Sequence, residues 1–171
     1  MQLPLAIDRD DRSAVISPCG LYRYRLGRRW GDGPPAMFLM LNPSKADAVD
    51  DDATLRRCVD YARRWGFPAL VVGNLFAFRA TDPADMKRAS DPVGPENDQH
   101  LIEMASSARL IVAAWGNHGA YLDRDKAVRR LIRRLPGSGR RPLKVLGLTQ
   151  AGQPVHPLRQ RVDLEPIGWE A

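Results

Sequence analysis

The chain has 171 residues and a net charge of +6, with 26 Lys and Arg against 20 Asp and Glu. This length fits one domain, residues 1–171, and is short for two independent cores. The two cysteines, Cys19 and Cys58, lack the paired spacing of a zinc or iron–sulfur site, so no metal centre is expected. No apolar run reaches the roughly 20 residues that span a bilayer, and residues 1–10 do not resemble a signal peptide. We therefore expect a soluble, cytoplasmic protein with no membrane partner, and we take it to be a monomer.

Arginine supplies most of the positive charge and occurs in pairs along the chain. Such a surface attracts polyanions, which makes nucleic acid a candidate partner. A solvated, arginine-rich surface explains the same charge equally well. The charge therefore allows nucleic-acid binding without selecting it.

The first third of the chain predicts a hairpin, a strand and a helix. Residues 14–18 and 21–29 are extended segments separated by Cys19-Gly20, which predicts an antiparallel hairpin within an N-terminal extension, residues 1–35. Residues 36–41 are apolar throughout, as in a strand buried on both faces. Residues 52–65 carry apolar side chains at helical spacing.

Strands and helices then alternate to the end of the chain. Strands are predicted at residues 69–72, 110–114 and 143–146, and helices at 95–107 and 119–135. Alternation of this kind predicts an α/β fold, a three-layer α/β/α sandwich with a four-stranded parallel central sheet. Ligands of such sheets bind beyond the carboxyl ends of the strands, so the residues that follow each strand are the candidate site.

Polar residues follow the first two strands. Asn42 stands before Pro43, which turns the chain so that Asn42 and Ser44 can point into a crevice, although an Asn that merely starts a turn fits too. Asp52, the last residue of an acidic triplet, suits a helix N-cap better than a cation site. Asn74 offers the paired donor and acceptor that can read a nucleobase edge, although it could equally satisfy unpaired backbone groups at the strand end.

The other candidates have two interpretations each. Phe76 is a core aromatic or a surface on which a base stacks. Asn117 and His118 lie in a glycine-bounded turn, where His118 caps a helix or faces the site. His156 lies near two prolines that would hold its imidazole in a fixed position. The chain has no nucleophile elbow, P-loop or HExxH motif, so these residues predict a polar ligand site without naming a reaction.

The four strand-end motifs resemble those of a bacterial family of unknown function. The motifs are LNPS with a following acidic stretch, NLFAxRATDP, WGNHG and GLTxxGxPxHPL, and together they cover most of residues 36–158. More distantly, their order and placement resemble the uracil-DNA glycosylase superfamily, which has a three-layer α/β sandwich around a four-stranded parallel sheet.

This second resemblance implies a role for each motif. Asn42 would position the water that attacks the sugar, and His156 would stabilise the departing base. Because Asn42 is not a carboxylate, Asp47 or Asp51 would have to reach the site to activate the water. Asn74 would read the base edge. From their positions at the strand ends, we add Phe76, Asn117, His118, Pro43 and Ser44 to the candidate base pocket. The resemblance makes Leu158 a wedge that enters the duplex, and the basic residues that we expect at phosphates are Arg159, Arg161, Arg79 and Lys45.

The leading hypothesis is a uracil-DNA-glycosylase-like protein that binds a flipped or modified nucleobase, with DNA as the first candidate partner, and hydrolyses its N-glycosidic bond. No metal or organic cofactor is needed for this reaction. One alternative is a non-catalytic binder of nucleic acid or nucleotides. A second is a metal-assisted nucleotide or phosphoester hydrolase that uses Asp47, Asp50, Asp51 and His118.

Overall fold

The computed structural model describes residues 11–44, 51–137 and 142–169. Along these ranges the elements are β1 (Asp11–Ile16), β2 (Arg23–Arg29), β3 (Ala36–Met40), α1 (Ala53–Arg64), β4 (Ala69–Asn74), α2 (Pro83–Arg88), α3 (Asn97–Ser107), β5 (Leu110–Ala113), the 3-10 turn η1 (Asn117–Asp123), α4 (Arg124–Arg133), β6 (Lys144–Val145) and β7 (Ile167–Gly168). None of the helices in these ranges is long and apolar enough to cross a membrane.

The strands form one mixed sheet in the order β1-β2-β4-β3-β5-β6-β7. The pairs β4-β3, β3-β5 and β5-β6 are parallel, whereas β1, β2 and β7 join antiparallel at the two ends. The predicted α/β class is confirmed. The prediction of a four-stranded parallel sheet was incomplete, because the N-terminal hairpin pairs with β4, from Leu26↔Val72 to Arg29↔Ala69, and thereby covers an edge that would otherwise be open.

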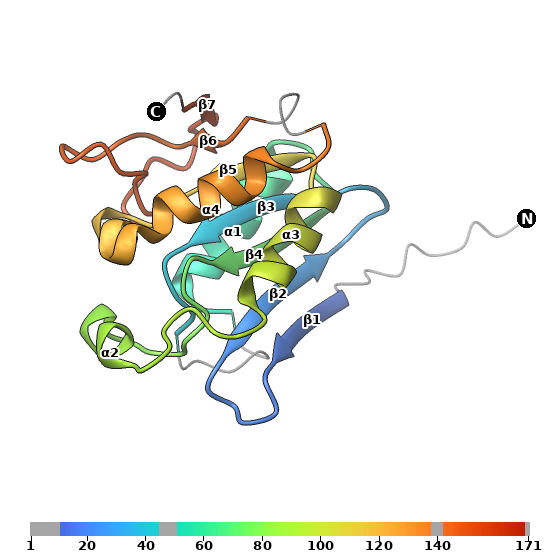
Figure 1. Cartoon of the computed structure of the whole chain (residues 1–171). Coiled ribbons are helices and arrows are strands. Elements are labelled where there is room, and N and C mark those ends of the chain that lie inside the picture. Colours follow the sequence, from blue (N-terminus) through green and yellow to red (C-terminus); the bar gives the residue numbers. More distant parts are fainter. Residues whose placement is uncertain (1–10, 45–50, 138–141, 170–171) are drawn as a thin grey trace, which may run out of the picture.

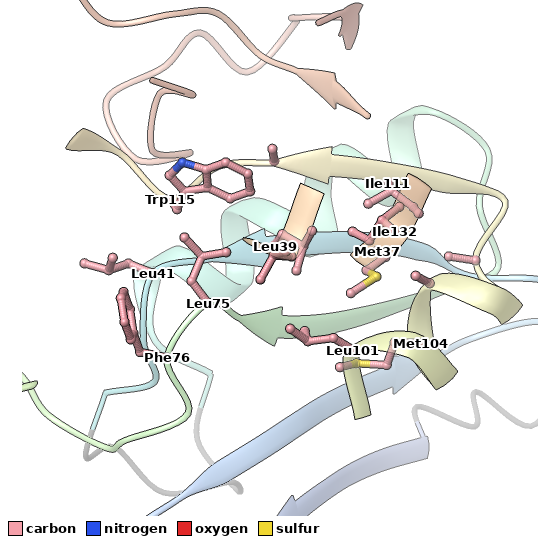
Figure 2. Close-up of a cluster of buried hydrophobic side chains, with 14 of the residues drawn as sticks. Met37, Leu39, Leu41, Leu75, Phe76, Leu101, Met104, Ile111, Trp115 and Ile132 are labelled. Atoms are coloured by element: carbon pink, nitrogen blue, oxygen red, sulfur yellow. The ribbon is translucent and has the colours of Figure 1, made fainter. Parts of the chain in front are cut away.

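Helices cover both faces of the sheet. Figure 1 shows α3 and α4 on one face and α1 on the other. All five residues of β3 are buried, as expected for a strand between two helical layers. Figure 2 shows the core on the face of α3 and α4, where Leu101 and Met104 of α3 and Ile132 of α4 lie around Met37 and Leu39 of β3.

The helix ends differ in part from the predictions. The backbone amide of Leu55 donates to Asp52 Oδ1 over 2.7 Å, which confirms Asp52 as the N-cap of α1. The predicted helix at residues 119–135 begins later, because Leu122 and Asp123 have φ values of 55° and 52° that separate η1 from α4. The six-residue α2 was not predicted, since so short a helix has no clear periodicity.

Candidate functional site

A cavity of about 390 Å³ lies beyond the carboxyl ends of the parallel strands. Its wall includes one polar residue or more from each of the four strand-end motifs: Asn42, Asn74, Asn117, His118 and His156. The N-terminal end of α1 and the start of β2 complete it. Its volume falls within the range of small-molecule sites, about 300–1,000 Å³. The structure therefore brings together residues up to 133 positions apart (156 − 23) around one cavity.

Asn74 is the most deeply buried polar residue of the cavity wall. It is only 3% exposed, and its carboxamide forms no hydrogen bond with any residue that the structure describes. Asn74 ends β4 on the same face as Val72, which also lines the cavity. The amide therefore presents two donors and an acceptor to the hollow, and none of them is used by the protein around it.

The backbone that carries Asn74 is held by two buried side chains. Asn97 Nδ2 donates to the carbonyls of Asn74 and Leu75 over 2.9 and 3.2 Å. Arg124 Nε donates to the same Leu75 carbonyl over 2.8 Å, and its Nη2 pairs with Asp98 at 2.5 Å. Sequence analysis missed Asn97 and Arg124, because neither residue lies at a strand end.

Asn42 uses its amide nitrogen, and not its amide oxygen, in hydrogen bonds within the fold. Its Nδ2 donates to the carbonyls of Ala80 and Pro43 over 2.8 and 3.2 Å, so the turn interpretation accounts for the amide nitrogen. Oδ1 forms no hydrogen bond in the described part of the chain. This oxygen is an acceptor without a formal charge.

His156 is held in one tautomer by its own loop. The backbone amide of Leu158 donates to His156 Nδ1 over 3.2 Å, which makes Nδ1 an acceptor and leaves the proton of a neutral ring on Nε2. Burial lowers the pKa of His156, and the Asp52 carboxylate opposes this shift. Near neutral pH the ring is therefore an uncharged Nε2–H donor.

Asp52 contributes a carboxylate to the cavity, whereas sequence analysis favoured a capping role for it over a cation site. Oδ1 accepts the Leu55 amide, while Oδ2 lies 3.5 Å from the Ser44 hydroxyl. Asp52 and Ser44 both line the cavity. A side chain that caps a helix and faces a site has the same sequence signature as one that only caps.

Two strand-end loops meet at the WGNHG motif. Gly116, with φ of 71°, donates its amide to the Pro154 carbonyl over 2.8 Å. Asn117 Oδ1 accepts from the Thr149 hydroxyl at 2.6 Å. A Cβ on Gly119 would lie 2.0 Å from the Trp115 indole, so glycine is required there.

His118 lies at the rim of the cavity. It is exposed, and its Nδ1 is 3.0 Å from Lys87 Nζ. Because an ammonium group has only donors, this nitrogen acts as the acceptor.

Several predicted site residues lie outside the cavity wall. Phe76 is fully buried in the core, 5.8 Å from the Tyr121 ring, and Figure 2 shows it beside Leu41. Pro43 accepts the Ala80 amide with its carbonyl and is buried. Asp51 accepts from the buried Arg28 guanidinium over 2.8 and 3.1 Å, so it serves an ion pair.

The predicted nucleic-acid contacts are scattered on the surface. Leu158 is half-buried and Arg159 is exposed, while Arg161 makes two hydrogen bonds to Asp163. Arg79 Nη1 donates to the Gly20 carbonyl over 3.1 Å and lines a second hollow. Lys45, Asp47 and Asp50 lie outside the described residues. Within the described ranges no three His, Cys, Asp or Glu side chains come together as metal ligands would.

Comparison with known proteins supports the first of the two resemblances. No curated protein and no solved structure matches the chain, so the likeness to uracil-DNA glycosylases is not shown. A family model, described as a protein of unknown function (DUF1643), matches residues 23–158, a span that contains all four strand-end motifs. The chain therefore belongs to the DUF1643 family.

Proposed function

We propose that the cavity binds a nucleobase, either one flipped out of a nucleic acid or a modified one, and that the protein hydrolyses its N-glycosidic bond. The observation that carries this proposal is the unpartnered carboxamide of Asn74, which is 3% exposed and lines the cavity. The polar atoms of this carboxamide border the cavity and form no hydrogen bond with the described residues, so they are open to a ligand. A base edge would supply the complementary donor and acceptor.

The other polar groups suit bond cleavage. When the bond between the sugar and a pyrimidine breaks, its electron pair goes to the base and the sugar becomes electron-poor. A donor at the base oxygen and a positioned water both favour that transition state. The Nε2–H of His156 is such a donor, and Asn42 Oδ1 is an acceptor that can orient the water. The water oxygen then bonds to the sugar carbon.

The attacking water must also lose a proton. Asn42 cannot take it, because an amide oxygen is a weak base. Among the described residues of the cavity wall, Asp52 supplies the carboxylate. Its Oδ2 is free of the capping bond, which uses Oδ1. We therefore assign to Asp52 the acceptor role that the sequence suggested for Asp47 or Asp51.

The test is base release from oligonucleotides that carry uracil, hypoxanthine, mismatched thymine, or oxidised or hydroxymethylated pyrimidines, without added metal and with chelator. Alkali-labile breaks at one modified base are expected. They should disappear in His156→Ala and fall about 10²-fold or more in Asp52→Asn. Asn is as good an N-cap as Asp, so this variant should remain folded. Asp60→Asn, on the exposed side of α1, is the matched control.

A non-catalytic binder is the second candidate, and the uncharged Asn42 favours it. Salt-sensitive binding of the same oligonucleotides without breaks would select this function. Breaks that require a divalent cation would instead select the metal-assisted hydrolase.

A further inference from the structure

An irregularity in β2 directs Arg23 into the cavity. Along the β1–β2 ladder Val15 pairs with Arg25 and Ile16 with Arg23, so Tyr24 is an extra residue without a partner. Tyr24 stacks on His100, and Arg25 pairs with Glu103, both on α3. Two successive side chains thus face the same helix, and the alternation resumes with Arg23 on the opposite face. Bulges re-aim side chains in this way, often beside active sites.

The guanidinium of Arg23 differs from those of the buried Arg28 and Arg124. Arg28 is bonded to Asp51, and Arg124 to Asp98 and the Leu75 carbonyl. Arg23, in contrast, forms no side-chain hydrogen bond or ion pair with any residue in the described ranges. Burial lowers its pKa, opposed by Asp52 and reinforced by Arg79 and Arg28. A partly buried cation without a partner is costly unless a ligand supplies the anion.

We propose that Arg23 binds a phosphate group of the nucleotide whose base Asn74 reads. This inference rests on the proposed function. The fork of a guanidinium matches two phosphate oxygens, and such charge-assisted bonds are about twice as strong as neutral ones. A cavity of about 390 Å³ also has room for more than a base. The phosphate can belong to a free mononucleotide or to a flipped nucleotide within a strand.

The experiment is calorimetric titration of the full chain at low salt with the common deoxynucleosides and deoxyuridine, their 5′-monophosphates, and short single-stranded oligonucleotides. The variants are Arg23→Gln and, as matched control on the same strand, Arg25→Gln. For the base that binds best, a phosphate-bearing ligand should bind at least about tenfold tighter than the nucleoside. Arg23→Gln should abolish that gain and leave nucleoside affinity unchanged, while Arg25→Gln should keep the gain.

The ligand series identifies the source of the phosphate. A gain with monophosphates assigns it to free nucleotides, and a gain confined to oligonucleotides assigns it to a strand. Two results would overturn the role of Arg23 in phosphate binding and leave the proposed function standing. One is nucleoside binding with no gain in affinity for either phosphate-bearing ligand, and the other is an equal loss of affinity for all ligands in Arg23→Gln. If no nucleoside, nucleotide or oligonucleotide bound, the proposed function would fail, and this inference with it.

Discussion

Replacing Asn74 by leucine should leave the stability of the fold nearly unchanged and abolish ligand binding. Asn74 is 3% exposed and has no hydrogen-bond partner within the described residues. The amide atoms border the cavity and their replacement breaks no hydrogen bond to a described residue, so leucine should change the free energy of unfolding by less than about 1 kcal/mol. For a chain of this size, that corresponds to a change in Tm of less than about 2–4 °C.

Thermal and urea unfolding measure the change in stability, and the oligonucleotide titrations measure binding. Asn97→Leu is the matched control, since Asn97 is also a buried asparagine. Its Nδ2 satisfies two backbone carbonyls, so its loss should lower stability by about 1–3 kcal/mol. If Asn74→Leu also destabilised the protein by 1 kcal/mol or more, the carboxamide would have a structural partner, and the case for ligand recognition would be lost.

Three further predictions concern the groups around the cavity. Gly119→Ala should lower the free energy of unfolding by about 1–3 kcal/mol, because its Cβ would overlap the Trp115 indole, whereas Gly147→Ala, with 3.7 Å to its nearest neighbour, should be tolerated. Asp51→Ala should destabilise by about 2–3 kcal/mol, because it leaves the 5%-exposed Arg28 without this carboxylate, and stability retained in urea would contradict the structural role. The pKa of His156 is below its usual 6.5, so the unfolded chain takes up a proton first. The stability contributed by the neutral ring is therefore complete above pH 6.5 and decreases as the pH falls from there towards the folded pKa. Urea unfolding at several pH values should show this pH dependence in the native chain and not in His156→Gln.

Much of the fold and part of the site could be predicted from local sequence. The apolar run before Asn42 implied a strand covered on both faces, and Asp52 implied a helix start, because both signals depend on a few adjacent residues. The placement of Asn42, Asn74 and His156 around one hollow follows from topology, since parallel strands end at the same edge of the sheet.

Other parts of the site depend on contacts between distant residues. Arg23 faces the cavity because the β1–β2 register shifts at Tyr24, whose ring stacks on His100, 76 positions away (100 − 24), and no local pattern indicates this shift. Phe76 packs in the core against Tyr121, whose position depends on the turn η1. Asp51 forms an ion pair with Arg28 of the N-terminal hairpin. The adjacent Asp52, and not Asp51, lines the cavity.

Three asparagines in this region separate the requirements of folding from those of function. Asn97 donates its amide nitrogen to two carbonyls and lies outside the cavity wall. Asn42 also donates its amide nitrogen within the fold, but its amide oxygen has no such bond. Neither amide group of Asn74 is bonded to a described residue. A loss of activity in an Asn42 variant therefore mixes folding with chemistry, because the Ala80 carbonyl loses its donor. A loss in an Asn74 variant reports recognition alone. Base recognition is accordingly the part of the proposed function that substitutions at one residue can test cleanly, whereas hydrolysis has to be tested at Asp52 and His156.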